Sequence, residues 1–348
     1  MPVADNFQRI RAFEKGAYIE LNARPARWLA INSGFRGAFF SVQDTSYFSP
    51  EPRLSVSFFP AKSTSLKFGY SKMGQFLHLL NSSSGGLPND LWIPASKKLP
   101  FAKSTQKSLA ITQDFGKMYS IELGAYYKTY SDLVDYGIGQ NFMTDFETNY
   151  EDQVEKGGIG KSYGFEFLLD KRYGELSGWI SYSYAKNLRN FATINEGQWY
   201  YANHDRRHII NITSSYKLND QVDLAANWIF QSGSPITVPV AVTTSLLGTS
   251  GNRYAEFLYR ERNNFRTPSY HRLDINANFT KETKRNNLRI FSVGVYNVYN
   301  HNNSFFLKTN YQPIFGNSRS EVLGWNIKTT KNNFLPFLPY ISYSIKFK

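Results

Sequence analysis

The feature that most constrains this sequence is an alternation of apolar and polar residues with a period of two, which recurs along its whole length. In the stretch that begins at Ser269, the two alternating sets are Leu273, Ile275, Ala277 and Phe279 against Arg272, Asp274, Asn276 and Asn278. Because successive side chains of a β-strand point to opposite faces, this pattern predicts half-buried strands, and helical periodicity is nearly absent. The alternation does not say whether the apolar face meets a protein core or lipid.

Strands of this kind recur as hairpins. The stretch above continues past a polar cluster near Lys284 into a second strand that ends at about Tyr299. Similar pairs are predicted at 17–24 with 27–40, 53–60 with 65–72, 105–115 with 118–134, 159–171 with 176–189, and 206–218 with 221–233, and a last strand at 337–347. The sequence therefore predicts an all-β, antiparallel fold of about 13 strands.

Short and long connections alternate between these strands. The long ones are predicted at 41–52, 73–104, 135–158, 190–205, 234–268 and 303–336. A soluble sandwich has no reason to place all its long loops at one end, whereas an outer-membrane barrel has short periplasmic turns and long extracellular loops. This asymmetry favours a portion of a transmembrane β-barrel.

The distribution of charge supports a hydrated interior. Polar or charged residues on the face opposite the apolar one are Glu20, Lys67, Glu122, Lys128, Glu166, Asp170, Asp223, Asn227, Asn276 and Lys346. Unpaired charges are rarely tolerated in a soluble core but are stable in a water-filled lumen. Tyrosines also gather where strands meet loops, at Tyr126, Tyr127, Tyr130, Tyr182, Tyr184, Tyr296 and Tyr299. They resemble the aromatic girdle of a membrane interface, although aromatic residues also favour strands in general.

Composition excludes several other classes. No run of 18 apolar residues occurs, so no transmembrane helix is expected, and zero cysteines exclude disulfides and thiolate metal sites. The net charge of +13 comes from Lys and Arg residues scattered singly, without a basic stripe, so nucleic-acid binding is not expected.

The beginning of the sequence suggests a portion of a larger barrel. MPVADNFQRIRAFEKGAYIE has no apolar segment after its charges, which predicts no secretory signal. An odd strand count also conflicts with the even number of bacterial single-chain barrels. We therefore expect an irregular N-terminal lead at 1–15 and the C-terminal part of a larger barrel at 16–348.

Several separated segments resemble a known family. They are SPEPRLSVSFFP, SLKFGYSKMGQFLHLL, GGLPNDLWIPAS, KSYGFEFLLDKRYGELSGWISYSYAKN, NHDRRHIINI, QSGSPIT, PSYHRLDINANF and VGVYNVYNHNN. In this order they resemble the C-terminal half of the barrel of TonB-dependent outer-membrane receptors, particularly the Bacteroidetes type. The resemblance implies a barrel of about 22 strands around an N-terminal plug domain, with the plug and the first strands absent from this sequence.

The resemblance also implies a function and partners. A ligand would bind the extracellular loops and be taken up across the outer membrane with energy from the TonB system, acting through the missing plug. Outer-membrane lipid is a partner in this interpretation, and a surface lipoprotein is a further one that it allows. The imported ligand is not identified. Two alternatives stay open, a complete smaller barrel such as a porin or adhesin, and a soluble all-β binding protein.

Candidate ligand contacts are aromatic and cationic residues of the predicted loops. Aromatic rings stack on sugars and ring systems, and guanidinium groups recognise carboxylates. The candidates are Trp92, Trp199, Tyr200, Tyr201, Arg260 and Arg262. No catalytic residue, metal site or cofactor is expected: G-x-S-x-G is absent, and although His204, Arg206 and His208 could share a strand face, we interpret them as structural residues at a strand entrance.

Overall fold

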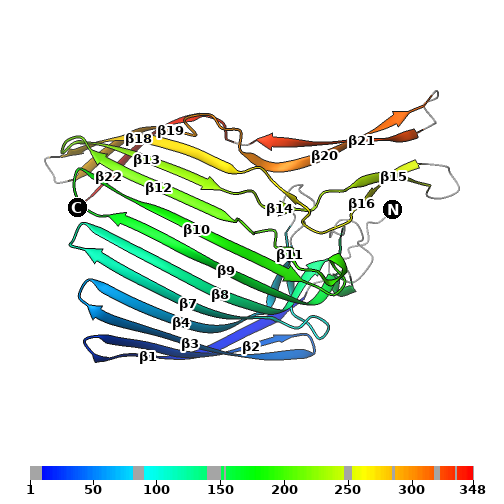
Figure 1. The fold of residues 1–348 in the computed structure, drawn as a ribbon, viewed down its shortest axis with the longest axis horizontal. Helices are drawn as coiled ribbons and strands as arrows, with labels where there is room; N and C mark the ends of the chain where they lie inside the picture. Colours follow the sequence, from blue (N-terminus) through cyan, green and yellow to red (C-terminus); the bar gives the residue numbers. More distant parts are fainter. Residues whose placement is uncertain are drawn as a thin grey trace.

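The computed structural model describes residues 10–80, 90–138, 150–152, 154–246, 253–283, 287–316, 322–333 and 335–347. Its main feature is one antiparallel sheet whose neighbouring strands follow one another along the chain (Figure 1). In order, these strands are β1 (Ala12–Ala26), β2 (Leu29–Val42), β3 (Thr45–Ala61), β4 (Thr64–Gln75), β7 (Ala102–Phe115), β8 (Tyr119–Tyr136), β9 (Val154–Lys171), β10 (Leu176–Asn190), β12 (His208–Lys217), β13 (Val222–Gln231), β18 (Tyr270–Glu282), β19 (Leu288–Tyr296) and β22 (Leu338–Lys346). The predicted all-β antiparallel class is confirmed.

The two ends of the sheet differ (Figure 1). At the turn end, short connections join β1 to β2, β3 to β4, β7 to β8, β9 to β10, β12 to β13 and β18 to β19. The opposite end, the loop end, carries small additional elements: β5 (Leu77–Leu80) with β6 (Leu91–Pro94), β14 (Pro235–Ile236) with β17 (Phe265–Arg266), β15 (Ala241–Leu246) with β16 (Arg253–Leu258), β20 (Ser304–Phe315) with β21 (Val322–Asn333), β11 (Tyr200–Tyr201) against β10, and the 3-10 turns η1 (Tyr150–Asp152) and η2 (Asn195–Gly197). No helix in the described ranges is long and apolar enough to cross a membrane.

One predicted loop is wrong. Residues 41–52 were expected to form a long connection, but β2 and β3 meet at a tight turn of Gln43 and Asp44. The range includes Pro50 and Pro52, and proline cannot donate a hydrogen bond within a sheet. In β3, however, Pro50 and Pro52 pair with β2 only, since the β3–β4 register begins at Arg53. Proline is tolerated at such an edge.

The N-terminal boundary also differs from the prediction. Most of the expected irregular lead, residues 1–9, lies outside the described residues, and β1 already begins at Ala12. The alternation within AFEKGAYIEL extends further toward the N-terminus than the predicted strand at 17–24, because Lys15 and Ala17 continue the register with Phe39 and Gly37 of β2.

The strand register assembles a continuous apolar outer face. One row across the sheet pairs Phe58, Leu66, Ile111, Leu123, Phe167, Tyr182, Ile210, Phe230 and His271 in succession. Directly opposite residues of paired strands share a face. Large apolar side chains on this face are exposed, for example Leu109 at 60% and Leu123 at 48%. An apolar surface of this extent is a membrane-facing or partner-facing surface.

Aromatic rings border this face toward the loop end. Tyr127 stacks with Tyr163, and Phe165 contacts both Tyr182 and Tyr184. The neighbouring rings continue through His208, Trp228, Phe230, His271 and Tyr299. Three tyrosines of the predicted girdle are exceptions. Alternation along β8 places Tyr126 and Tyr130 on the inner face, with Lys128. Tyr296 also lies on the inner face, where its ring is 4.2 Å from the guanidinium carbon of Arg272.

The inner face is a hydrogen-bonded polar surface. Arg272 binds Asp274 at 2.9 Å, and the amide of Asn276 donates to Asn278, which in turn donates to Asp223 at 2.7 Å. The stretch that begins at Ser269 therefore has the two-sided character predicted for it. Its apolar residues lie in the outer rows and its polar residues in the inner network.

The sheet ends in two open edges. Within the described residues, β1 pairs with β2 alone and β22 with β19 alone. Every pairing along the path is antiparallel and the path has an odd number of strands, so β1 and β22 run in the same direction. The two edges cannot pair with one another in the antiparallel manner of the rest of the sheet.

Buried apolar residues gather at the loop end rather than inside the sheet. One cluster joins Phe40, Phe76 and Phe101, and a second joins Leu80, Leu99 and Val134, among others. A third consists of Phe191, Ile194 and Tyr200. These clusters fix the loop hairpins against the ends of the long strands, and this packing positions the site described next.

Candidate functional site

A buried ion-pair network holds three segments of the loop end together. The Arg262 side chain is fully buried, and its Nη2 lies 2.6 Å from Oδ1 of Asp135 at the end of β8. The other carboxylate oxygen of Asp135 accepts from Arg189 of β10 at 3.0 Å and from the Tyr200 hydroxyl at 3.4 Å. Arg262 also donates to the carbonyl of Tyr136. One carboxylate therefore neutralises two arginines that are distant in sequence.

Asparagine side chains extend this network between the loops. Oδ1 of Asn195 accepts the backbone N–H of Arg262 at 2.7 Å. The Asn263 amide donates to the carbonyl of Tyr201 and to Asn203, each at 2.6 Å. Because these contacts join the segment near 195–203 to the segment near 260–263, the two loops form one surface.

That surface contains the outer pocket, a depression of about 510 Å³. Its lining residues are Asn195, Glu196, Gln198, Trp199, Tyr200, Tyr201, Pro235, Arg260, Glu261, Arg262, Asn263, Asn264, Phe265 and Arg266. Five of the six predicted ligand contacts are among them. The sixth, Trp92, lies on β6 and is 57% exposed, away from this pocket.

The five residues have different surroundings. Trp199 and Arg260 are exposed, whereas Tyr200 and Arg262 are buried and make the contacts with Asp135. Burial and the nearby Asp135 charge raise the pKa of Tyr200 far above its ordinary value, so its hydroxyl stays protonated as a donor. The ring of Tyr201 lies under Arg207 and Arg266, at 4.8 and 5.5 Å from the guanidinium carbons. A hydrogen bond with Arg207 is the main cause of a lowered Tyr201 pKa.

Arg207 and Arg266 are fixed by a second carboxylate. Asp205 is fully buried, and Oδ2 of Asp205 lies 2.6 Å from Arg266 and 3.4 Å from Arg207. Arg266 also donates to the Gly233 carbonyl at 2.7 Å. These arginines were not among the predicted ligand contacts. Their role depends on residues from three segments that meet only in the fold.

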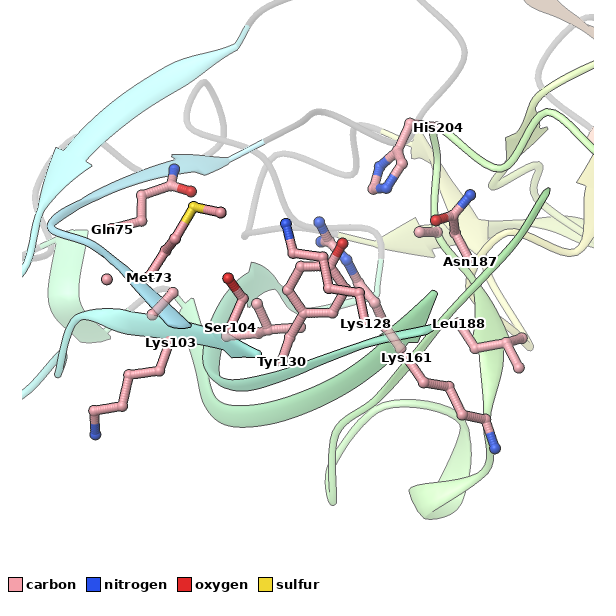
Figure 2. Close-up of a pocket in the computed structure, with 15 residues that line it drawn as sticks. Met73, Gln75, Lys103, Ser104, Lys128, Tyr130, Lys161, Asn187, Leu188 and His204 are labelled. Carbon is pink, nitrogen blue, oxygen red and sulfur yellow. The ribbon is translucent and has the colours of Figure 1, made fainter. Parts of the chain in front are cut away.

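A second depression, the inner cavity of about 430 Å³, lies on the polar face where β4, β7, β8 and β10 approach the loop end (Figure 2). It is lined by Met73, Gly74, Gln75, Ala102, Lys103, Ser104, Lys128, Tyr130, Leu133, Lys161, Asn187, Leu188, Arg189, Ala202 and His204. Arg189 connects it to the outer pocket, because Asp135 binds both Arg189 and Arg262.

His204, Arg206 and His208 do not share one strand face. His208 begins β12 and its Nδ1 lies 2.9 Å from the Tyr182 hydroxyl, on the aromatic border of the outer face. His204 precedes the strand and lines the inner cavity instead. In the described ranges, no group of three His, Cys, Asp or Glu residues could hold a metal ion. The fold also brings together His271 and His301, whose ring centroids are 3.6 Å apart.

His204 should titrate far below an ordinary histidine. The ring lines the inner cavity but is largely buried, and burial disfavours the charged imidazolium. This desolvation, together with the positive charge of Arg189, lowers the pKa of His204 to about 4. An unfolded histidine titrates near about 6.5. The unfolded segment therefore binds a proton that the folded loop end excludes, and stability should fall as pH drops from about 6.5 toward 4.

Histidine NMR of the intact protein would measure this titration. The His204→Gln variant identifies the resonance and should remove this histidine's share of the acid destabilisation. A midpoint close to the ordinary value would show that the cavity solvates the imidazolium fully.

Comparisons with known proteins agree on the fold. A family model described as TonB dependent receptor-like, beta-barrel matches residues 2–298. The FrpB iron transporter from Neisseria meningitidis has a TM-score of 0.59 at 13% identity, over 97% of this chain and 45% of that chain. The siderophore receptor PirA from Acinetobacter baumannii has a TM-score of 0.55 at 17% identity, over 83% and 42%. The ferric-catecholate import receptor Fiu from K12 E. coli has a TM-score of 0.58 at 11% identity, over 97% and 45%.

This chain spans less than half the length of these solved structures. No curated protein matches the sequence. At these identities the solved structures show the fold alone.

Proposed function

Because this chain belongs to the TonB dependent receptor-like β-barrel family, we propose that it binds a ligand at its extracellular loops, within a receptor that imports the ligand using energy from the TonB system. The family consists of outer-membrane transporters and receptors rather than enzymes. The chain is accordingly an outer-membrane protein, whose turn end is periplasmic and whose loop end is extracellular.

The observation that carries the proposal is the convergence of predicted ligand contacts in the outer pocket. Trp199 comes just before β11 and Arg260 just after β16, so they belong to different loop segments, yet they line the same depression at the extracellular end. An exposed ring and an exposed guanidinium offer stacking and bidentate recognition to a passing ligand. Arg262 and Tyr200 support this surface from below through Asp135.

The proposal includes the larger assembly. We propose that the chain forms the C-terminal part of a larger receptor barrel of the Bacteroidetes type, whose plug contacts the TonB system. Two observations support this arrangement. The sheet has two open edges, and the chain covers less than half of the FrpB structure. Outer-membrane lipid would cover the apolar outer face, and a surface lipoprotein could cover the loop end. A complete porin-like barrel is less favoured, because β1 and β22 cannot pair antiparallel.

The solved neighbours suggest the first ligands to test. They are an iron transporter, a siderophore receptor and a ferric-catecholate import receptor. A labelled ferric siderophore, an oligosaccharide and a peptide would therefore form the first panel, applied to cells that carry the intact receptor.

Substitution of Trp199 or Arg260, the two exposed pocket residues, should weaken binding of any probe from this panel that the receptor binds. We expect Trp199→Ala to weaken binding by about tenfold, since loss of one stacking contact costs about 1–1.5 kcal/mol. Arg260→Ala should have a comparable effect if the ligand carries an acidic group. Whole-cell binding of the labelled probe measures both effects, and uptake should stop when the proton gradient is dissipated while surface binding persists.

Matched controls lie at the turn end. Trp28→Ala and Arg172→Ala remove the same side-chain types from exposed positions at the periplasmic side, where Trp28 is 53% exposed. Equal losses for the loop-end and turn-end variants would contradict a ligand site in the outer pocket.

A further inference from the structure

We propose that the inner cavity is an anion-binding subsite in which Lys128 recognises a carboxylate or phosphate group of the ligand. This inference rests on the proposed function, because it assumes that ligand reaches the lumen from the outer pocket. It adds the chemical class of the ligand, which neither the family nor the solved neighbours assigns to this chain.

The lining of the cavity has one sign of charge. The cations on its inner face are Lys128 and Arg189, the backbones of Lys103 and Lys161 also contribute to its wall, and no aspartate or glutamate is among its lining residues. A concave site with walls of low dielectric constant and charges of one sign concentrates counter-ions. The cavity therefore favours an anionic group over a neutral or cationic one.

Three of the four cations already have partners. Lys103 binds Asp132 at 3.0 Å, Arg189 binds Asp135 at 3.0 Å, and the Lys161 ammonium lies 4.2 Å from the centre of the Trp199 ring. In Figure 2 the ammonium groups of Lys103 and Lys161 point away from the centre of the cavity. Two of these residues are therefore paired with carboxylates, and the third contacts an aromatic ring.

Lys128 is different. It lies on the inner face of β8, half-buried, and its side chain runs beside Tyr130 near the centre of the cavity (Figure 2). Its ammonium is 5.0 Å from the centre of the Tyr130 ring. In the described part of the chain it makes no ion pair within 4.0 Å. A half-buried ammonium without a carboxylate is poorly solvated, so an entering anion gains a strong interaction.

Neutral polar groups around Lys128 suit an oxyanion. Gln75, Ser104 and Asn187 line the same cavity, and Asn187 accepts a hydrogen bond from Ser162 through its carbonyl oxygen, which leaves its N–H groups to donate. His204, with a pKa of about 4, adds no charge at neutral pH. Recognition at pH 7 therefore depends on Lys128, with Arg189 held at the cavity wall by Asp135.

Citrate is the probe for the test, with inorganic phosphate and glucose as comparison solutes. Calorimetric titration of the purified intact receptor in detergent at low salt should show citrate binding that weakens as salt rises. The Lys128→Gln variant should bind citrate at least about tenfold more weakly, as expected for loss of one charge-assisted contact. Lys128→Arg, which keeps the charge, should retain most of the affinity. Phosphate binding that is also lost in Lys128→Gln would show recognition of oxyanions in general, and citrate binding alone would show recognition of carboxylates.

Lys103→Gln is the matched control, because Lys103 lines the same cavity but is paired with Asp132. It should bind citrate within about twofold of the wild-type protein. Equal citrate affinity in Lys128→Gln and wild-type protein would overturn the proposal. The proposal would also be overturned if the wild-type receptor bound no citrate and Lys128→Gln lowered its melting temperature. That combination would show that Lys128 is paired with a carboxylate of the protein itself elsewhere in the intact receptor.

The outcome is separable from that of the proposed function. If Trp199→Ala abolishes ligand uptake while Lys128→Gln leaves citrate binding unchanged, the receptor function stands and the anion subsite fails. If Lys128→Gln abolishes citrate binding in a protein that imports none of the probes, the subsite stands and the receptor function fails.

Discussion

Refolded into lipid vesicles as the only polypeptide, this chain is expected to form no monomeric closed barrel. Both edge strands would leave backbone N–H and C=O groups without partners in hydrocarbon. Each unsatisfied group costs on the order of 2–7 kcal/mol in an apolar environment, and an open edge places a row of such groups in the hydrocarbon. Because β1 and β22 run in the same direction, antiparallel closure requires an odd number of further strands.

Electrophoresis without heating, together with protease digestion of the vesicles, would measure closure. A complete single-chain outer-membrane barrel of similar mass serves as the control and should show the usual heat-dependent change in mobility. A second copy of this chain inserted in the same orientation should not rescue closure, because its edges would again meet in parallel. A monomeric, protease-resistant band from this chain alone would refute the expectation.

Removal of the buried arginine should loosen the extracellular loops. Arg262→Met leaves the carboxylate of Asp135 with one arginine instead of two, in a site where Arg262 and Asp135 are 0% and 3% exposed. Breaking a buried ion pair from one side costs about 3–5 kcal/mol. We expect this loss to appear as faster hydrogen exchange in the segments near 195–201 and 260–266, while exchange in the long strands stays unchanged.

Arg260→Met is the matched control, because Arg260 is exposed on the same loop and makes none of the contacts with Asp135. Its exchange should match that of the wild-type protein. The double variant Asp135→Asn with Arg262→Met should recover part of the protection, since no buried charge then lacks a partner and Arg189, at 21% exposure, stays hydrated. Equal exchange in Arg262→Met and Arg260→Met would show that the network does not hold the loops.

Sequence analysis could predict strands, hairpins and faces because each depends on neighbours in the chain. The alternation of Leu273, Ile275 and Phe279 with Asp274 and Asn276 was sufficient to assign the two faces of β18. It failed at Pro50 and Pro52, where the tolerance for proline depends on whether a third strand is present beside β3. That condition is set by residues on β4, which local patterns do not report.

The candidate site could be predicted only in part. Loop position and side-chain chemistry indicated Trp199, Tyr200, Tyr201, Arg260 and Arg262, and the structure places all five around one pocket. Sequence could not separate the exposed Arg260 from the buried Arg262, because the difference arises from Asp135, which lies 127 positions away. Sequence analysis placed Lys128 on the inner face, but its lack of a carboxylate partner became visible only in three dimensions.

The sequence by itself determined that this protein is a sheet of paired strands with one apolar and one polar face, because side-chain alternation follows directly from strand geometry. The tertiary structure alone decided which loop residues meet, which charges are paired and which edges stay open. These properties depend on contacts between segments far apart in the chain, and their energies are set by burial and by hydrogen-bond partners that no local pattern contains.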